Sequence, residues 1–288
     1  MRIDAARAWL MVQLAHSESA ALDADCLLCA VLDCSRTHLF TWPERELDAE
    51  QWARLQALAV RRVAGEPVAH LLGWREFWSL PLMVDASTLI PRPDTEVLVE
   101  QALARLPVDG TAPVLDLGTG TGAIALAIKS ERPARPVWAV EFSEAALALA
   151  RRNSAALNLP LALRQGSWFG PLAGQRFALI VSNPPYIDGA DPHLAQGDVR
   201  FEPASALVAD EQGLADLRHI IQLAPDHLLP AGWLLLEHGW QQGPAVRQLL
   251  RERGFVQVET CRDYGDQERV SLGQWPAAGG TAGEASCI

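Results

Sequence analysis

Apolar residues recur at helical spacing over the first quarter of the chain. Residues 6–14 and 22–32 place apolar side chains three or four positions apart, which predicts two amphipathic helices. A third helix is predicted to follow Asp48, because Gln51 stands where it can complete a capping box. Glycine and proline separate these segments. We therefore expect residues 1–73 to form a small helical bundle.

The next segment changes period and is rich in turn residues. Two short apolar runs flank Ser79-Leu80-Pro81, which predicts a hairpin. The prolines of Ile90-Pro91-Arg92-Pro93 hold that stretch extended. We therefore predict a β-hairpin linker over residues 74–93. Asp94 is expected to cap a helix that runs to Leu106.

From residue 113 onward, short apolar runs alternate with amphipathic stretches. This alternation predicts a doubly wound α/β fold around a mostly parallel sheet. Seven strands are expected, at 114–117, 137–140, 161–164, 177–182, 233–237, 256–261 and 269–273. Residues 94–275 should therefore form one α/β domain with an insertion between residues 187 and 210. The Ala/Gly-rich tail, residues 276–288, is expected to be disordered.

Three glycines within five residues follow the first expected strand. The loop Gly118-Thr119-Gly120-Thr121-Gly122 opens a helix, so backbone can approach a ligand closely at the carboxyl end of the strand. Glu141 ends the second strand 19 residues beyond Gly122, where an acidic residue commonly binds ribose hydroxyls. With Ala123 the loop also satisfies the dinucleotide pattern G-x-G-x-x-A. A NAD-type oxidoreductase and a nucleotide-binding module therefore both stay open.

The fourth expected strand ends abruptly in Asn183-Pro184-Pro185-Tyr186. Each proline fixes its own φ and lacks an N–H, and Pro185 also keeps Pro184 out of the helical region. The Asn183 side-chain oxygen and the Pro184 carbonyl then form a pair of acceptors suited to both hydrogens of a planar –NH2 group. Tyr186 adds a flat face against such a group. An isolated Asn-Pro would more simply be a strand-end turn.

Charge and composition narrow the class of partner. The 288 residues include 24 basic and 35 acidic ones, and a net charge of −11 argues against a protein held on nucleic acid by phosphate contacts. No signal peptide and no span of membrane length are visible, so a cytoplasmic protein that does not bind membranes is expected. The five cysteines are expected to be reduced thiols, and their spacing predicts no metal site.

In combination, the glycine loop, the acid after the second strand and the Asn-Pro-Pro-Tyr corner resemble the class I S-adenosylmethionine-dependent methyltransferases that methylate planar amino groups. Nearly the whole chain, to about Gly273, is similar to the bacterial peptide chain release factor N5-glutamine methyltransferases (the HemK/PrmC family). The further blocks that carry this similarity are Gly65-Glu66-Pro67, Arg75-Glu76-Phe77-Trp78, Ile90-Pro91-Arg92-Pro93-Asp94-Thr95-Glu96, Asn183 to Ile187, Glu237-His238-Gly239-Trp240 and Arg262-Asp263-Tyr264-Gly265.

The resemblance implies a fold, an activity and a partner. The fold is a Rossmann-like seven-stranded sheet with an N-terminal helical bundle, here interpreted as a substrate-recognition domain. The activity is methylation of the side-chain amide nitrogen (N5) of the glutamine in the Gly-Gly-Gln motif of class-1 peptide chain release factors. S-adenosyl-L-methionine is the methyl donor, S-adenosyl-L-homocysteine is the product, no metal is needed, and a monomer is expected.

Residue roles follow from the same resemblance. Gly118, Thr119, Gly120, Thr121 and Gly122 form the cofactor loop. Glu141 binds the ribose and Trp168 lies beside the adenine, while Asn183 to Tyr186 hold the substrate. Asn183, Pro184 and Tyr186 are the expected catalytic residues, and Asn183 also borders the cofactor.

The chain departs from the family pattern at two positions, and two alternative substrates stay open. Glu141 stands where Asp is usual, and Ser167 occupies a position that is often Asp, so the adenine-amino contact made there is not implied for this chain. The same clamp occurs in ribosomal-protein glutamine methyltransferases and in adenine-amino nucleic-acid methyltransferases. The net charge argues against the adenine reading only.

Overall fold

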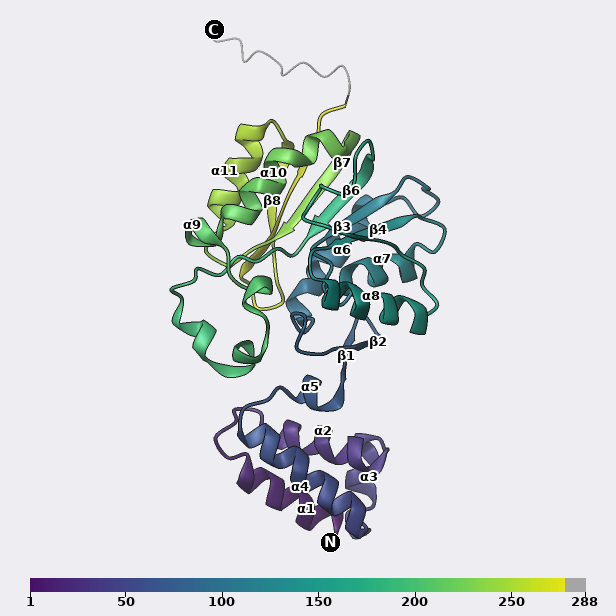
Figure 1. Cartoon of the computed structure of the whole chain (residues 1–288), viewed down its shortest axis with the longest axis vertical. Helices are drawn as coiled ribbons and strands as arrows, with labels where there is room; N and C mark the ends of the chain where they lie inside the picture. The colour runs from purple at the N-terminus through teal and green to yellow at the C-terminus, as the bar shows by residue number, and fades with distance from the viewer. Residues whose placement is uncertain (278–288) are drawn as a thin grey trace. The chain divides into compact units, whose positions relative to one another are not determined.

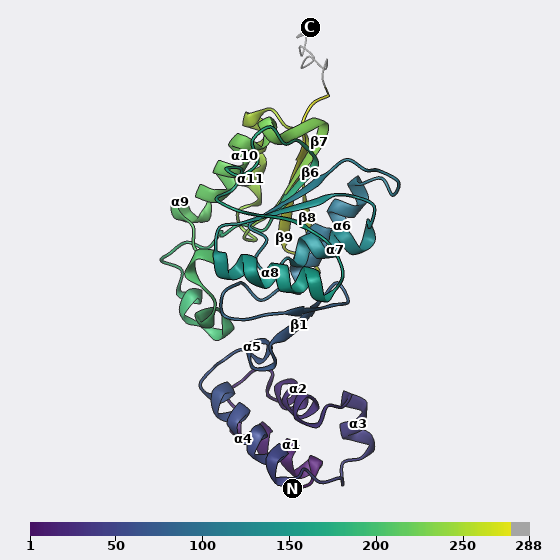
Figure 2. The same ribbon diagram turned by 45° about the vertical axis from the view of Figure 1, so that its right-hand side comes forward.

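The computed structural model describes residues 1–277 and divides them into two compact units (Figures 1 and 2). One unit consists of residues 1–74 together with residues 193–201. The other consists of residues 75–192 and the chain from residue 202 onward. Of the tail predicted to be disordered, residues 278–288 lie outside the described part. No helix within the described residues is long and apolar enough to cross a membrane.

The smaller unit is helical, as its apolar spacing predicts. Its helices are α1 (Ile3–Gln13), α2 (Ala20–Leu32), α3 (Arg36–Thr41), α4 (Ala49–Val63) and α5 (Val68–Leu72). The capping box is confirmed, because Asp48 accepts a hydrogen bond from the Gln51 backbone and the Gln51 side chain accepts one from Asp48. Helices α3 and α5 were not predicted, since five or six residues are too few to show a helical period.

Residues 193–201 join this unit through a charged contact. Arg62 donates to Asp23 at 2.8 Å and to Asp198 at 3.1 Å, and its side chain is nearly buried. Charged pairs of this geometry are stronger than exposed ones because solvent screens them less. A segment from the middle of the sequence is thus held by the N-terminal helices.

The hairpin packs as part of the larger unit. Strands β1 (Trp74–Phe77) and β2 (Leu80–Met83) form a two-stranded sheet, and Phe77 and Leu82 are buried in the main core. The turn is at Trp78-Ser79, where φ is 54° and 57°, so the prediction that Leu80 and Pro81 lie in the turn was wrong. Burial of Phe77 and Leu82 on either side sets the turn position.

The helix after the hairpin begins differently from the prediction. Pro93–Thr95 form a 3₁₀ turn, η1, and α6 (Glu96–Arg105) follows it directly. The predicted Asp94 cap was wrong, because no side chain caps either segment. The 3₁₀ turn instead supplies the first hydrogen bonds through the backbone.

A seven-stranded sheet forms the centre of the larger unit and confirms the predicted fold class. Its strands are β3 (Val114–Leu117), β4 (Val137–Glu141), β5 (Ala162–Gln165), β6 (Phe177–Ser182), β7 (Leu228–Glu237), β8 (Val256–Arg262) and β9 (Glu268–Gln274). The order is β5-β4-β3-β6-β7-β9-β8, with only β9 antiparallel to its neighbours. The start of β7 was predicted too late, because Leu228 pairs with Phe177 before an irregularity around Ala231.

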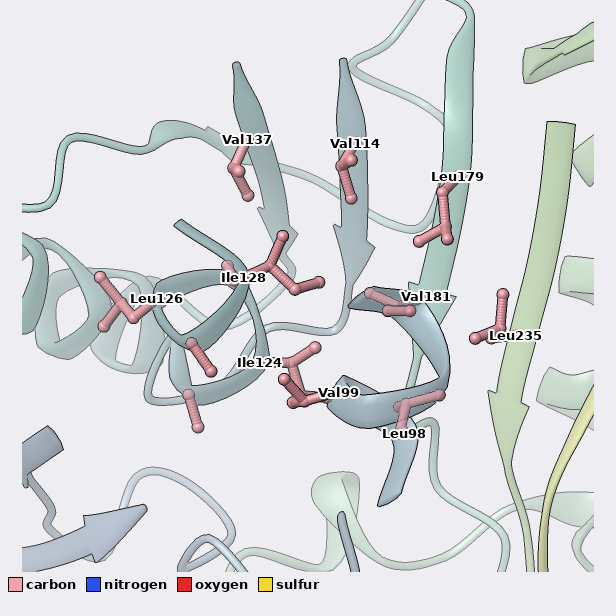
Figure 3. Close-up of a cluster of buried hydrophobic side chains, with 14 of the residues drawn as sticks. Leu98, Val99, Val114, Ile124, Leu126, Ile128, Val137, Leu179, Val181 and Leu235 are labelled. Carbon is pink, nitrogen blue, oxygen red and sulfur yellow. The ribbon is translucent and has the colours of Figure 1, made fainter. Parts of the chain in front are cut away.

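Helices cover both faces of this sheet. The remaining helices are α7 (Ala123–Glu131), α8 (Glu144–Ala156), α9 (Asp210–Gly213), α10 (Ala215–His227) and α11 (Gly243–Arg253). Figures 1 and 2 show α10 and α11 on one side of the sheet and α6 and α7 on the other. Figure 3 shows strand side chains that point toward α6 and α7, among them Val114, Val137, Leu179 and Leu235. Both faces are therefore apolar, as in other buried parallel sheets.

The predicted insertion after β6 contains three 3₁₀ turns, η2 (Pro192–Ala195), η3 (Gly197–Phe201) and η4 (Ala204–Ala206). Its two ends are held together, since Ile187 and Val208 form a bridge. Glu202 is buried and accepts from Arg92 at 2.7 and 2.8 Å and from the Ile90 N–H at 3.2 Å. These contacts fix η4 beside the carboxyl ends of the strands.

The sheet register aligns four chain positions at one edge. Leu117 pairs with Val140 and with Ser182, and Ser182 pairs with Leu236. The residues that follow, Gly118, Glu141, Asn183 and Glu237, therefore lie in a row. The strand order reverses between β3 and β6, which is where open α/β sheets bind ligands.

Candidate active site

The glycine loop after β3 places backbone without side chains at the carboxyl edge of the sheet. Gly118 and Gly120 have φ of +69° and +54°, which side chains adopt only with strain. A β-carbon on Gly118 would lie 3.5 Å from the Trp168 ring, so this indole lies close to the loop. Thr119 donates to the buried Asp116 carboxylate at 2.6 Å, which ties the loop to the strand below it. Burial, opposed by that hydrogen bond, raises the pKa of Asp116 to about 7.

Glu141 connects the loop to the next strand. Its two carboxylate oxygens accept from the Gly120 N–H and from the Ser143 N–H, each at 2.9 Å. Ser143 in turn caps α8, because its side chain accepts from the Ala146 N–H. A carboxylate has about four lone-pair sites, so Glu141 can still accept from two hydroxyl groups. The longer Glu arm therefore reaches both backbone donors and keeps acceptors for a ligand.

Two hollows adjoin at the loop and share Gly118, Pro185 and Ser205. The first is also lined by Thr119, Gly120, Thr121, Glu141 and Asn183, but not by Gly122. Every residue that lines either hollow belongs to the larger unit. The predicted cofactor loop, the predicted ribose acid and the predicted clamp asparagine thus face one cleft.

The second hollow is bordered by aromatic side chains. Phe142 and Trp168 both line it, together with Ser167 and Asp216. Burial raises the pKa of Asp216, and a hydrogen bond from Trp168 opposes the shift. Phe142 is 74% exposed and borders this hollow, so its ring is free to lie against a bound planar group. Sequence reasoning missed Phe142 and Asp216, although the position of Phe142 directly after Glu141 could have indicated it.

The Asn-Pro-Pro-Tyr corner presents acceptors beside the first hollow. Asn183 Nδ2 donates to Thr95 Oγ1 at 3.3 Å. Within residues 1–277 no donor forms a hydrogen bond with Asn183 Oδ1 or with the Pro184 carbonyl. Pro184 itself is buried, whereas Pro185 lines both hollows. Asn183 therefore brings a carbonyl-type acceptor without a donor to the first hollow, and the Pro184 carbonyl that follows it in the chain also has no donor within the described residues.

Tyr186 is held by a buried carboxylate. Its hydroxyl donates to Glu237 Oε1 at 3.3 Å, and its ring packs against the apolar core between the sheet and helices α10 and α11. Burial, and then the nearby Glu237, raises the pKa of Tyr186. Burial also raises the pKa of Glu237 to about 7, while hydrogen bonding from Thr95 and the charge of Arg269 oppose the shift. Sequence reasoning missed Thr95 and Glu237, although both stand in the blocks that carried the family resemblance.

The switch-point cleft, the glycine loop and the polar corner define the class: the larger unit is a methyltransferase domain of the class I type. A crystal structure of a methyltransferase from Pyrococcus furiosus supports this fold, with a TM-score of 0.54 and 18% identity over 77% of this chain and 98% of that one. The family descriptions that match are "PrmC N-terminal domain" over residues 5–73 and "Methyltransferase small domain" over residues 93–211.

Curated relatives define the family more closely. The release factor glutamine methyltransferase of Escherichia coli (strain K12) is 58% identical over 264 residues, covering 91% of this chain and 95% of that protein. The protein of the same name from Shewanella oneidensis is 54% identical over 269 residues, covering 93% and 94%. The chain belongs to the release factor glutamine methyltransferase family.

Proposed function

We propose that this protein transfers a methyl group from S-adenosylmethionine to the side-chain amide nitrogen (N5) of the glutamine in the Gly-Gly-Gln motif of class-1 peptide chain release factors. Relatives that carry this activity in their name cover almost the whole chain at more than half identity. The observation that carries the proposal is the position of Asn183, whose Oδ1 has no donor within the described residues, in a hollow that it lines together with the glycine loop.

The residues at the cleft fit an S-adenosylmethionine molecule. Loop residues 118–122 would lie against its methionine part, and Glu141 would accept from its ribose hydroxyls. Its adenine would lie in the second hollow beside Phe142 and Trp168. The Asp216 carboxylate stands in that hollow and can accept from the adenine amino group, which compensates for the serine at position 167. The bound cofactor supplies an electrophilic methyl group, and we expect no metal to be needed.

The chemical difficulty is the weak nucleophile. An amide nitrogen shares its lone pair with the carbonyl, so it reacts slowly with a methyl donor. In the proposed complex its two N–H groups donate to Asn183 Oδ1 and to the Pro184 carbonyl, which leaves one face of the nitrogen open. Pro185 keeps the Pro184 carbonyl rigid, and Tyr186 lies next along the corner to border the carboxamide. Ideal positioning of this kind can contribute ~7–11 kcal/mol.

Bond changes balance without a metal or a redox partner. The new N–C bond forms as the C–S bond of the donor breaks, and the sulfur keeps the bonding electron pair. The nitrogen then releases one amide proton, which restores the neutral amide as N5-methylglutamine. Asn183 and Pro184 hold the two N–H groups up to that point, so their role is to orient rather than to remove the proton beforehand.

The division of labour between the two units is also part of the proposal. Residues 1–73 contain no cluster of catalytic type and match a separate family description, which supports a role in recognising the protein substrate. Residues 94–275 carry most of the cleft, and the hairpin region 74–93, which joins the two, adds Ser87, Thr88, Leu89 and Pro91 to the lining of the first hollow. We expect the enzyme to act as a cytoplasmic monomer on a protein and not on nucleic acid or membranes.

A labelling panel tests the substrate. The protein is incubated with methyl-labelled S-adenosylmethionine and, separately, with a class-1 release factor, the same factor with its loop glutamine changed to alanine, a ribosomal-protein extract and DNA. Label on the unmodified factor alone is expected. Label on DNA or on ribosomal protein, with none on the factor, would replace the proposal with one of the rival substrates.

A further inference from the structure

The segment of residues 90–96 contacts the clamp asparagine through Thr95. Arg92 is paired with the buried Glu202, and Glu96 accepts from the Trp78 N–H at 2.9 Å. Pro91 and Thr95 both line the first hollow. The two ends of the segment are therefore anchored, so Thr95 is held at a fixed place beside Asn183.

Thr95 lies between the clamp and a buried carboxylate. It is only 4% exposed, and its hydroxyl oxygen accepts from Asn183 Nδ2 at 3.3 Å. On its other side is Glu237, 2% exposed, whose Oε1 accepts from the Tyr186 hydroxyl at 3.3 Å. The second oxygen, Glu237 Oε2, has no hydrogen-bond partner within the described residues, and the nearby Thr95 hydroxyl opposes the rise in the Glu237 pKa, so Oε2 is an acceptor available to the threonine.

Hydrogen-bond direction follows from the donors present. A threonine hydroxyl has one hydrogen to donate, and an ionised carboxylate is the strongest acceptor in reach. The Thr95 hydrogen is therefore directed to Glu237, which leaves only lone pairs facing Asn183. Asn183 must then present its NH2 group to Thr95, and its Oδ1 must point the other way.

We propose that Thr95 and Glu237 are positioning residues that hold the Asn183 amide with its oxygen toward the substrate carboxamide. This inference rests on the proposed function. Without the relay, the amide could turn by 180° and present an N–H to the substrate N–H, which would repel the glutamine. The sheet register explains the arrangement, since Glu237 follows β7 at the level where Asn183 follows β6.

Protonation of Glu237 should weaken this orientation. A neutral carboxylic acid can donate to Thr95, which frees the threonine hydrogen to point at Asn183 and favours the turned amide. The groups that face Glu237 are Thr95, Tyr186, Arg269 and Asp94, of which Asp94 favours protonation and Arg269 opposes it. Burial raises the pKa of Glu237 to about 7, so turnover should fall as the pH is lowered through that value.

The first test replaces Thr95 in the full-length enzyme. Thr95→Val keeps the shape but removes the hydroxyl, and we expect kcat on a release factor to fall ~10- to 100-fold, as for a misplaced reacting group. The dissociation constant for S-adenosylmethionine, measured by calorimetry, should change less than about threefold and reports that the variant is folded. Thr95→Ser should restore most of the rate. The matched control is Thr260→Val, which also loses a hydroxyl hydrogen bond but lies on β8, the outermost strand.

A second readout reports the orientation itself. A release factor whose loop glutamine is changed to glutamate presents a carboxylate, which two acceptors repel and a turned Asn183 amide would bind. We therefore compare the inhibition constant of the glutamate-containing factor with the Michaelis constant of the normal factor. This ratio should be several-fold lower in Thr95→Val than in the wild type. Glu237→Gln is neutral and can donate to Thr95 as the protonated acid does, so it should lower turnover at pH 8 and lose the decline near pH 7. Asp116 has a similar pKa, so this variant is needed to assign the decline.

The outcomes separate the inference from the proposed function. If the wild-type enzyme does not label the release factor, the proposed function itself fails. If the wild type is active but Thr95→Val matches it in kcat and in discrimination against the glutamate factor, the positioning role is wrong. An equal loss of rate in Thr95→Ser, or a pH decline that persists in Glu237→Gln, would also overturn it.

Discussion

Replacing Asn183 by alanine gives the sharpest test of the clamp. The change removes Oδ1, one of two acceptors proposed to hold the substrate N–H groups, and leaves the Pro184 carbonyl. Loss of one preorganised hydrogen-bonding group in an active site typically lowers kcat by ~10²–10³. Because the second acceptor remains, we expect the lower end, about 100-fold, which corresponds to ~2.7 kcal/mol in activation free energy.

The contacts of Asn183 predict that Asn183→Ala has only small effects on stability and on cofactor affinity. The hydrogen bond from Asn183 to Thr95 is long, at 3.3 Å, so its loss should lower the unfolding free energy by no more than ~1 kcal/mol. Neither the glycine loop nor Glu141 is hydrogen-bonded to Asn183, so cofactor affinity should change less than about threefold. Asn183→Ala should therefore lower turnover strongly while leaving cofactor affinity almost unchanged.

The assay measures single-turnover methyl transfer to a release factor, with S-adenosylmethionine binding followed by calorimetry. Asn158→Ala is the control, because Asn158 is exposed after α8 and has φ of 53°, where alanine costs stability but touches no part of the cleft. An unchanged transfer rate in Asn183→Ala would refute the clamp. Asn183→Asp keeps an acceptor but adds charge beside the sulfonium, so it separates hydrogen bonding from electrostatics.

Three further variants examine the cofactor loop and the buried acids. Gly120→Ala should weaken S-adenosylmethionine binding at least tenfold in calorimetry, because φ is +54° and the methyl group enters the hollow; Gly174→Ala, at φ +74° on an open surface, should not. Glu141→Gln should weaken cofactor binding about tenfold, and this loss should shrink for an analogue without ribose hydroxyls. The raised pKa values of Glu237 and Asp116 mean that their stability contribution is present at low pH and lost as pH rises to about 7. The free energy of unfolding in urea should therefore decrease from pH 5 to pH 8 by up to ~3 kcal/mol more in the wild type than in Glu237→Gln. An equal decrease in the two proteins would contradict this.

Much of the larger unit could be predicted because its signals are local. Each parallel strand is a short apolar run, and each is followed by the loop or helix that its own residues specify. Asn183 and Glu141 were found for the same reason, since each ends a strand and strand ends meet at one edge of a parallel sheet. The predicted roles of the site residues remain predictions for the experiments above.

The remaining features depend on contacts between distant parts of the chain. Thr95 and Asn183 are separated by 88 positions, and no local pattern marks their hydrogen bond. The 3₁₀ turn η4 follows Glu202, which pairs with Arg92, 110 positions away in the sequence. Asp94 failed as a cap because the anchored proline segment places a 3₁₀ turn there, which a propensity argument for aspartate does not include.

The pairing of Arg62 with Asp198 has a practical consequence for dissecting the molecule. A fragment that starts at Arg75 would keep residues 193–201 but lose the helices that hold them, while a fragment of residues 1–74 would lack its interrupted piece. Cutting the protein at its apparent boundary should therefore damage both products. Each unit is therefore better studied within the intact chain.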